Sequence, residues 1–418
     1  MLKNYLKIAI AVLLRRKFLT FVNLFGTVLT LTVLVVAFAF FDTIVSPGGA
    51  QRRHDHVLSV QGVLLTGSTG SWGSGVGPAF FARHVEPLRT PDRVSYATQP
   101  RVATSYLDGR KVTVQLRRTD AAYWQILDFD LRTGRALSAD DVATGRFVAV
   151  INEATADTYF GAEPPLGKTL TLDAQSFEVV GVVANEPETN RLAFADVWVP
   201  LTATESSAYE QEWLANGQAI LYVEDPSRRT AMAEEFRDLL RRFEYTPDPT
   251  QFDTAVAAAA TPLELLAFAA VNEGPGVEMF AQNYVATFIG LSALAALLFM
   301  ALPAINMTNL NIGRILERAP EIGLRKATGA SVRVLVGQFV FESVVLAALG
   351  GLLAFAAAPF VLDVLNDIFT YGQFRVNGAV FVAGLVFVAV FGVLSGAYPA
   401  WKMARLDPAA ALRGLHHA

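Results

Sequence analysis

The stretch FLTFVNLFGTVLTLTVLVVAFAFF, residues 18–41, has no charged side chain and is long enough to cross a lipid bilayer. About 20 consecutive apolar residues are needed for that. A cleaved signal peptide is the alternative, but its apolar core is shorter and a small-residue cleavage site follows it. We therefore predict an uncleaved membrane anchor. The composition agrees, because 17% of the residues are charged, against about 25% in a typical soluble domain.

Three further apolar stretches predict membrane spans at residues 284–311, 334–362 and 376–398. Lys and Arg cluster before the first span, between the second and third, and after the fourth, whereas the short loop 363–375 has Arg375 alone. Because cytoplasmic loops are enriched in Lys and Arg, both termini are predicted inside and residues 42–283 outside. The basic residues are Lys3, Lys7, Arg15, Arg16, Lys17, Arg314, Arg318, Arg325, Lys326, Arg333, Lys402, Arg405 and Arg413.

The predicted fold class is an α-helical membrane protein with four transmembrane helices and a large α+β extracytoplasmic domain between the first two. Residues 1–17 are basic and amphipathic and predict a helix on the cytoplasmic membrane surface. A cytoplasmic loop at 312–333 and a tail at 399–418 complete the organisation. Within the external domain, alternation and helical spacing predict strands at 111–119, 176–185, 196–201 and 219–225, a strand and capped helix over 146–161, and a helix at 229–243. The Gly- and Ser-rich residues 67–77 predict a mobile loop.

The stretch AEPPLGKT, residues 162–169, is one letter from the phosphate-binding pattern G-x-x-x-x-G-K-[ST], with Ala162 in place of the first glycine. Such a loop needs a following helix, but the next residues alternate like a pair of strands. Pro164 and Pro165 also lack the amide N–H groups that bind phosphate. We predict a turn that enters a β-hairpin, and no ATP hydrolysis by this chain.

No catalytic or cofactor site is predicted in the external domain. The chain has no cysteine, and its net charge of −4 does not indicate nucleic-acid binding. His54, Asp55 and His56 could hold a metal, but the favoured interpretation is a solvated linker because no further ligand follows at regular spacing. The acidic residues Asp140, Asp141, Glu153 and Asp157 are scattered and predict surface positions.

A few polar side chains fall inside the predicted spans. Glu342 lies about two turns into the third span, where an ionisable group should face protein rather than lipid. A structural or dimer hydrogen bond is favoured there over proton transfer. Asn306 and Asn309 follow Pro303 near the end of the second span, and predict either a hinge or polar helix contacts. Gly350 in the third span predicts close helix packing.

The cytoplasmic loop contains ILERAPEIGLRKATGAS, residues 315–331. Pro320 suits the first turn of a helix, and Glu321 suits the positive end of its dipole. The segment predicts a short helix on the membrane surface. It could contact lipid headgroups, or a partner protein could grip its apolar face.

This loop resembles the signature of the MacB/FtsX family of ABC-transporter permeases, E-R-x-x-E-I-G-x-R-x-A-x-G-A-S. Pro320 departs from the arginine usual there. The tail at 398–413 and the segments GRALSADD, VAVINEATADTYFG, PLGKTL and EVVGVV are similar, in order, to other parts of the family. The matching loop residues are Glu317, Arg318, Glu321, Ile322, Gly323, Arg325, Ala327, Gly329, Ala330 and Ser331.

The resemblance implies a non-catalytic permease subunit of the bacterial inner membrane, with no cofactor of its own. A separate cytoplasmic ATPase would bind ATP and Mg²⁺, and its work would move the periplasmic domain, by mechanotransmission, for efflux or export. A second permease copy or paralogue, membrane lipids and a periplasmic adaptor are the other expected partners. The expected ATPase contacts are Glu317, Arg318, Glu321, Ile322, Gly323, Leu324, Arg325, Lys326, Gly329 and Ala330.

Two alternatives stay open. The chain could be an FtsX-like or LolC-like subunit that regulates cell-wall hydrolases or extracts lipoproteins. It could also be a membrane-anchored sensor or scaffold that has no ATPase. The coupling signature is the feature against the sensor, and an ATPase gene beside this one would discriminate between them.

Overall fold

The computed structural model describes most of the chain and divides it into two compact units. The described residues are 17–68, 70–107, 109–204, 206–245, 251–271, 284–317 and 331–376, with single positions between 378 and 397. Residues 1–16, 318–330 and 399–418 and most of the fourth predicted span lie outside them. The helical unit comprises Met1–Phe41, Gly290–Ile368 and Phe374–Ala418. The α+β unit comprises Asp42–Ile289 and Phe369–Gln373.

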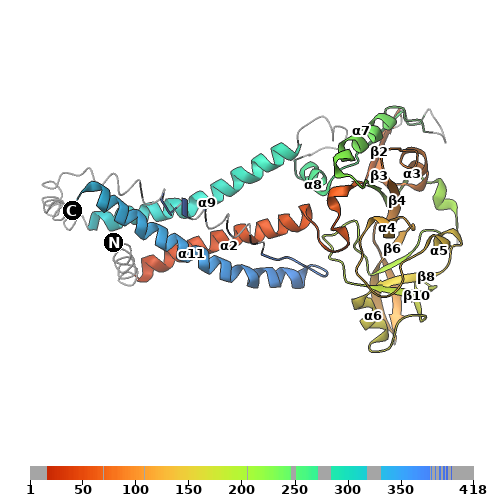
Figure 1. Cartoon of the computed structure of the whole chain (residues 1–418), viewed down its shortest axis with the longest axis horizontal. Helices are drawn as coiled ribbons and strands as arrows, with labels where there is room; N and C mark the ends of the chain where they lie inside the picture. Colours follow the sequence, from red (N-terminus) through yellow and green to blue (C-terminus); the bar gives the residue numbers. More distant parts are fainter. Residues whose placement is uncertain are drawn as a thin grey trace. The chain divides into compact units, whose positions relative to one another are not determined.

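Three long helices make up most of the described part of the helical unit (Figure 1). They are α2 (Lys17–Val45), α9 (Tyr284–Glu317) and α11 (Val332–Ile368). Among the described residues, two segments are long and apolar enough to cross a membrane, Thr20–Val45 and Val336–Ile368. The apolar part of α9 that meets the same test of composition, Tyr284–Phe299, is shorter. The count of four spans stays a prediction.

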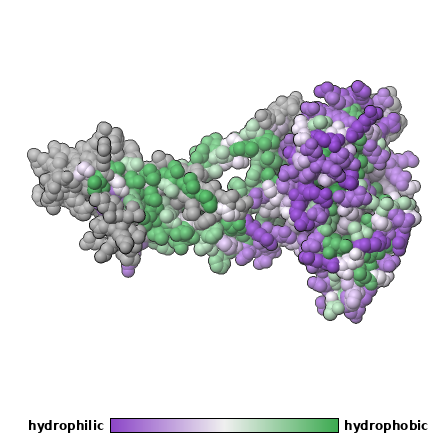
Figure 2. Space-filling model, in the orientation of Figure 1, coloured by the Kyte–Doolittle hydropathy of each residue, from purple (hydrophilic) through white to green (hydrophobic). Residues whose placement is uncertain are grey.

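The surface of the helical unit differs in chemistry from that of the α+β unit. Figure 2 shows hydrophobic residues gathered over the helices and hydrophilic residues over most of the α+β surface. Large apolar side chains are exposed along the helices, including Phe18, Phe21, Phe25, Leu352 and Phe360. Such a continuous apolar surface suits lipid or a second helical unit better than water.

Helices α2 and α11 pack closely, as the glycine in the third predicted span indicates. A Cβ added to Gly350 would lie 2.7 Å from Thr27 Cγ2, so the small residue permits the approach. Leu31, Leu346 and Ala354 are buried in the same contact. Helix α11 continues past residue 362, the expected end of the span, to Ile368.

The α+β unit is built on a ten-stranded mixed sheet. Its order is β1-β13-β4-β6-β11-β8-β10-β7, with β5 paired to β6 and β9 paired to β10. Pairs β10–β8 and β11–β6 are parallel. The bounds are β1 (Val57–Val60), β4 (Arg93–Thr98), β5 (Arg101–Leu107), β6 (Arg110–Thr119), β7 (Leu131–Gly134), β8 (Val148–Asn152), β9 (Thr169–Leu172), β10 (Gln175–Val183), β11 (Val197–Pro200) and β13 (Gly217–Tyr222).

A second sheet corrects one prediction from the sequence. It has the order β12-β3-β2-β14, formed by β12 (Leu214–Ala215), β3 (Gly70–Val76), β2 (Val63–Gly67) and β14 (Thr254–Ala257). The mobile loop predicted at 67–77 is therefore wrong, because most of it is strand β3. Strand β2 pairs with β3 on one side and with the distant β14 on the other, and those partners override the weak local preference of Gly and Ser.

Short helices connect and cover the sheets. They are α3 (Pro78–His84), α4 (Tyr123–Ile126), α5 (Ala139–Ala143), α6 (Glu153–Phe160), α7 (Arg229–Leu240) and α8 (Pro262–Val271), with 3-10 turns η1 (Gly49–Gln51), η2 (His54–His56), η3 (Ala208–Gln211) and η4 (Pro226–Arg228). The predicted strand and helix over 146–161 are confirmed. Asn152 caps α6 by accepting a hydrogen bond from the Thr155 N–H at 2.8 Å, and Gly161 ends it with a φ of 56°.

Three apolar clusters form the core of the α+β unit. One lies around Phe80 and Phe236, one around Trp198 and Tyr123, and one around Phe177. The predicted helix at 229–243 is α7, which buries Met232, Phe236 and Leu240 at four-residue spacing. These clusters pack the central strands of the main sheet, which support the loops at their ends.

Candidate functional site

The predicted coupling residues fall at the limit of the described chain. Glu317 is the last residue of α9, Ser331 precedes α11, and the residues between them lie outside the description. Asn306 and Asn309 belong to α9, and their side chains are likewise outside it. The roles predicted for these residues stay predictions.

Glu342 is described, and it faces protein. Its side chain is buried in α11, and Gln338, one turn earlier, donates an Nε2–H hydrogen bond to its Oε1 at 3.2 Å. A carboxyl group in this setting has a polar partner within its own helix. The structural role predicted for Glu342, in preference to proton transfer, stays a prediction.

In the α+β unit, polar contacts converge on the loop at residues 184–196, between β10 and β11, which we call the clamp loop. Its second half is fixed to the sheet by Arg117 of β6, whose side chain is fully buried. The guanidinium donates to the backbone carbonyls of Leu192 and, at 2.8 Å, Arg191. Tyr123 Oη donates to the Leu192 carbonyl as well, at 2.8 Å. Burial lowers the pKa of Arg117, but an arginine stays cationic.

The last residue of the clamp loop, Asp196, is tied to two central strands. One carboxylate oxygen accepts from the backbone N–H of Gln115 in β6 at 2.7 Å, and the other accepts from Asn152 Nδ2 in β8 at 3.1 Å. Since Asn152 also caps α6, one side chain joins the clamp loop to that helix. The clamp loop is therefore held rigidly although it is not a strand or a helix.

The chain segment that follows α2, residues 48–56, enters the α+β unit against the clamp loop; we call it the anchor segment. The Glu186 carboxylate accepts from the Ala50 N–H at 2.9 Å. Asn190 Nδ2 donates to the Gly48 carbonyl at 3.0 Å and to Glu186 at 2.8 Å. Glu186 is only 2% exposed, and burial raises the pKa of its carboxyl group.

Gly49 is required for this contact. Its φ is +60°, a conformation that residues with a side chain rarely adopt. A Cβ there would lie 2.5 Å from Glu186 Oε2, so the carboxylate occupies the space of the missing side chain. Gly48, the preceding residue, has no atom within 4 Å of the same position.

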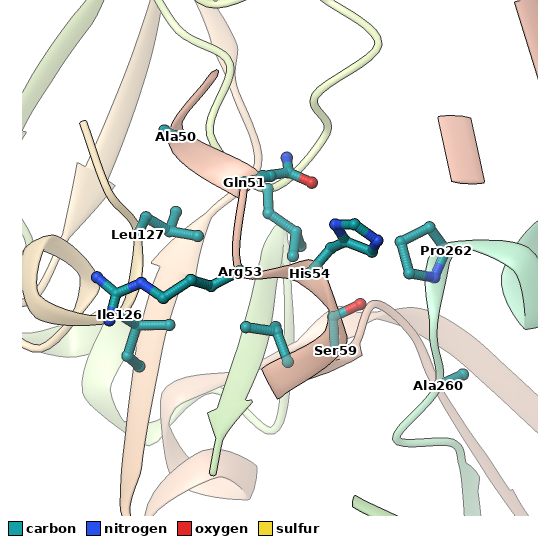
Figure 3. Close-up of a pocket in the computed structure, with 11 residues that line it drawn as sticks. Ala50, Gln51, Arg53, His54, Ser59, Ile126, Leu127, Ala260 and Pro262 are labelled. Carbon is teal, nitrogen blue, oxygen red and sulfur yellow. The ribbon is translucent and has the colours of Figure 1, made fainter. Parts of the chain in front are cut away.

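The anchor segment continues beside a small cavity of about 10 Å³ (Figure 3). That volume suits about one water molecule. Figure 3 shows Gln51 and His54 at the cavity, with the His54 ring near Pro262. In the described part of the chain, Gln51 Nε2 and His54 Nδ1 are buried and have no hydrogen-bond partner, so both would be satisfied by water.

The solvated linker predicted at His54–Asp55–His56 is an ordered turn, η2, and none of the three residues is buried. His56 Nδ1 lies 3.0 Å from the Val223 carbonyl oxygen, and its ring stacks on Tyr222. Aromatic packing against β13 thus fixes His56 in the α+β unit. Among the described residues, no three His, Cys, Asp or Glu side chains gather as metal ligands.

The segment that follows α11, Phe369–Gln373, also belongs to the α+β unit; we call it the return loop. The Thr370 carbonyl accepts from the Glu188 N–H of the clamp loop at 3.1 Å. Tyr371 Oη donates to Asp196 Oδ1 at 2.8 Å. The clamp loop thus holds both the chain that follows α2 and the chain that follows α11.

The stretch AEPPLGKT takes the predicted form of a turn that enters a hairpin. Strand β9 begins at Thr169 and pairs with β10. The turn lines an open groove of about 330 Å³ that Glu153, Asp157 and Glu163 also line. Three carboxylates would repel the phosphates of a nucleotide. Lys168, the residue that would bind phosphate, is paired with Glu163 and lies over the Phe160 ring.

The acidic residues near GRALSADD do not all lie on the surface. Asp141 is fully buried and completes the capping box of α5 with Ser138. Arg135 holds its carboxylate at 2.5 and 3.1 Å, and Arg146 lies at 3.4 Å. These partners hold the pKa of Asp141 far below its usual range although burial alone would raise it. The surface prediction for Asp141 is wrong because two arginines compensate the buried charge.

Sequence reasoning missed the clamp loop, the anchor segment and the return loop. Ala50 and Glu186 are 136 residues apart, and Tyr371 and Asp196 are 175 apart, so no local pattern links them. One signal was present in the strand KVTVQLRRT. Arg117 lies on the face of the strand opposite to Val114 and Leu116. That face would be solvated unless another segment covered it.

Two family matches cover most of the chain in order. Residues 20–239 match the family described as MacB-like periplasmic core domain. Residues 293–408 match the family described as FtsX-like permease C-terminal. The first match takes in the clamp loop and the anchor segment, and the second takes in α11 and the return loop.

Several known proteins are similar to this chain over most of its length. The chain is 27% identical over 400 residues to the macrolide export ATP-binding/permease protein MacB of Wolinella succinogenes, covering 93% of this chain and 58% of that protein. It is 28% identical to the MacB protein of an Azoarcus species, of which it covers 57%. The chain thus spans a little over half the length of these relatives. It is 25% identical to the uncharacterized ABC transporter permease YknZ of Bacillus subtilis, and the match covers 75% of each chain.

Among solved structures, the periplasmic region of MacB from Actinobacillus actinomycetemcomitans is similar. The match covers 53% of this chain and 97% of that one, at 15% identity and a TM-score of 0.36.

Proposed function

Because this chain belongs to the MacB/FtsX family of ABC transporter permeases, we propose that it is the membrane subunit of a transporter whose ATPase drives motion of the periplasmic α+β unit. The observation that carries this proposal is the ordered pair of family matches over residues 20–239 and 293–408. The substrate is taken from the periplasm or the outer leaflet and does not pass between the helices. The helices transmit motion from the ATPase to the periplasmic α+β unit.

The coupling signature supports the role of the cytoplasmic loop. Glu321 and Arg325 carry opposite charges four positions apart, and Ile322 and Leu324 are apolar. An ATPase that binds ATP and Mg²⁺ docks here, on the segment of chain between α9 and α11. Two copies of this permease, or one copy and a paralogue, complete the assembly in the bacterial inner membrane, where a periplasmic adaptor is a further partner.

The contacts in the α+β unit support the proposed transfer of motion from the helices to this unit. Work arriving through α2 needs a stiff connection, because a flexible linker would dissipate it. The anchor segment is such a connection, since Glu186 and Asn190 hold Gly48 and Ala50 against a loop that buried Arg117 fixes to the sheet. A scaffold protein with no ATPase would not need this stiffness.

The test is charge reversal in the coupling loop. The variants Glu321→Lys and Arg325→Glu are expressed with the chromosomal ATPase and purified from membranes in mild detergent. We expect at least a tenfold loss of co-purified ATPase, about 1.4 kcal/mol, with membrane insertion unchanged. Glu234→Lys is the matched control, because Glu234 is exposed on α7 of the α+β unit.

The outcomes separate the proposed function from its rival. A stoichiometric ATPase that is lost in both loop variants and retained in the control supports it. If the unmodified chain brings down no ATPase, and ATP hydrolysis stays at background, the sensor or scaffold function takes its place. If the ATPase binds all variants equally, the docking surface lies elsewhere.

A further inference from the structure

Two segments that follow different long helices converge on one loop. The anchor segment after α2 bonds to Glu186 and Asn190, and the return loop after α11 bonds to Glu188. All three residues lie in one five-residue stretch of the clamp loop, residues 186–190. Arg117 fixes the same loop to β6, so it cannot follow both helices if they move differently. Any difference in motion must be absorbed at one of the two attachments.

The return loop is the weaker attachment. It is held to the clamp loop by the Glu188–Thr370 backbone bond at 3.1 Å and by the Tyr371–Asp196 bond at 2.8 Å. Tyr371 is half-buried and Glu188 is exposed, and Asp196 is 8% exposed, whereas Glu186, which holds the anchor segment, is 2% exposed. Tyr371 also has a φ of +52°, which is unfavourable for a residue with a side chain. Such a conformation persists only while its surroundings enforce it.

We propose that the return loop is a latch, closed by Tyr371 on Asp196, that opens and closes while the anchor segment stays bound. In the closed state the return loop is bonded to the clamp loop. Opening releases the return loop from the clamp loop, relieves the backbone strain at Tyr371, and leaves Asp196 with its bonds to Gln115 and Asn152. As a step in the transport cycle, this inference rests on the proposed function; as a contact, it does not.

The first experiment tests the contact in the full chain, without any ATPase. Hydrogen–deuterium exchange is measured in detergent for the unmodified chain, Tyr371→Phe and Tyr159→Phe. Tyr159 is the matched control, because its buried hydroxyl has no partner among the described residues. Losing one hydrogen bond should raise exchange at residues 369–373 and 186–190 about three- to tenfold in Tyr371→Phe only. Exchange at residues 48–51 should stay unchanged.

That experiment has two outcomes that would overturn the latch. Exchange at residues 186–190 that is the same in all three proteins means that the return loop does not hold the clamp loop. Exchange that rises equally at residues 48–51 means that the two attachments are one cooperative structure. Neither result depends on whether an ATPase binds.

The second experiment locks the latch. The chain has no cysteine, so the pair Glu188→Cys with Thr370→Cys adds the only two thiols. A backbone hydrogen bond of 3.1 Å joins residues 188 and 370, and a disulfide needs their Cα atoms roughly 4.4–6.8 Å apart. We expect oxidation to join residues 188 and 370 and to lower ATP turnover of the assembled transporter at least fivefold, with recovery on reduction. The single-cysteine variants are the controls.

The two experiments keep the latch and the transporter apart. If no disulfide forms in the double variant, the latch is overturned whatever the ATPase does. If it forms and turnover is unchanged, opening of the latch is not part of the cycle. If the disulfide forms and no ATPase associates with any variant, the proposed function fails while the contact at Tyr371 stands.

Discussion

The anchor segment and the return loop contact the same clamp loop with different chemistry. The anchor segment presents backbone groups to a buried carboxylate, and Gly49 leaves the space that this carboxylate fills. The return loop presents one carbonyl to the exposed residue Glu188 and one phenol to Asp196, which is 8% exposed. Burial makes the difference, because an unpaired group costs more free energy away from water than near it. The anchor segment therefore cannot separate without a large cost, and the return loop can.

One irregular loop thus binds the two segments that follow α2 and α11. Loops are normally the adaptable part of a domain, but the clamp loop takes its rigidity from the buried guanidinium of Arg117 and from Asp196 at its end. Because the clamp loop is rigid, the strength of each attachment decides whether the anchor segment or the return loop stays bound to it.

Replacing Arg117 with Met should have the largest effect. The substitution leaves the Arg191 carbonyl without its side-chain donor, while the Leu192 carbonyl keeps the bond from Tyr123 Oη. An unsatisfied group costs about 1–3 kcal/mol, and we expect unfolding of the α+β unit to become easier by an amount in that range. Denaturant unfolding of the full chain in detergent, followed by tryptophan fluorescence, measures the change. Hydrogen exchange should rise in the anchor segment and the return loop together.

Arg118→Met is the control for Arg117. Arg118 is the next residue of β6 and points to the other side of the strand, where its guanidinium bonds to the Ala203 carbonyl and to Gln175. It is less buried, and it does not contact the clamp loop. Faster exchange at only one of the two attachments in Arg117→Met would break the comparison, because it would mean that they do not share a support.

Gly49→Ala should come second. The added Cβ would meet Glu186 Oε2 at 2.5 Å, and alanine is strained at a φ of +60°. Together these effects should cost about 2 kcal/mol, expressed in the anchor segment and not in the return loop. Gly48→Ala is the matched control, since nothing lies within 4 Å of its Cβ position and its φ is −86°. Hydrogen exchange at residues 48–51 separates the two variants; equal exchange would mean that the Glu186 contact contributes nothing.

How much of this could be read from the sequence depends on the range of the interaction. The cap at Asn152, the end of α6 at Gly161, and the periodicity of α7 are local signals, and the structure confirms them. The turn at AEPPLGKT was also predictable, because the alternation after Lys168 and the two prolines lie within a few residues of it.

The parts that could not be predicted depend on distant partners. Gly and Ser at residues 67–77 indicate a loop, but strand β14, nearly 190 residues away in sequence at Thr254, stabilises the hairpin. Glu186, Asn190 and Tyr371 have no distinguishing neighbours. The side of β6 that carries Arg117 looked solvated, because only the fold covers it. A buried polar contact depends on two segments that lie far apart in the sequence. Neither segment alone indicates that the contact forms.

The smallest predicted effect is the pH dependence of the anchor segment. Burial, the largest influence, raises the pKa of Glu186, and nearby Asp130 raises it further, while Asn190, Ala50 and Arg52 oppose the rise. For an acid with a raised pKa, the folded state binds more protons than the unfolded state. Its contribution to stability is therefore complete below the unfolded pKa and is lost as the pH rises through the folded pKa.

Hydrogen exchange at residues 48–51, corrected for the intrinsic rate, should therefore be slower in mild acid than at neutral pH. Glu186→Gln, which does not titrate, should remove this difference. The return loop should show no such dependence, because burial raises the pKa of Tyr371 to about 12 and the phenol keeps its proton throughout. A parallel pH dependence at both attachments would mean that they open as one unit, and the distinction between a fixed anchor and a latch would be lost.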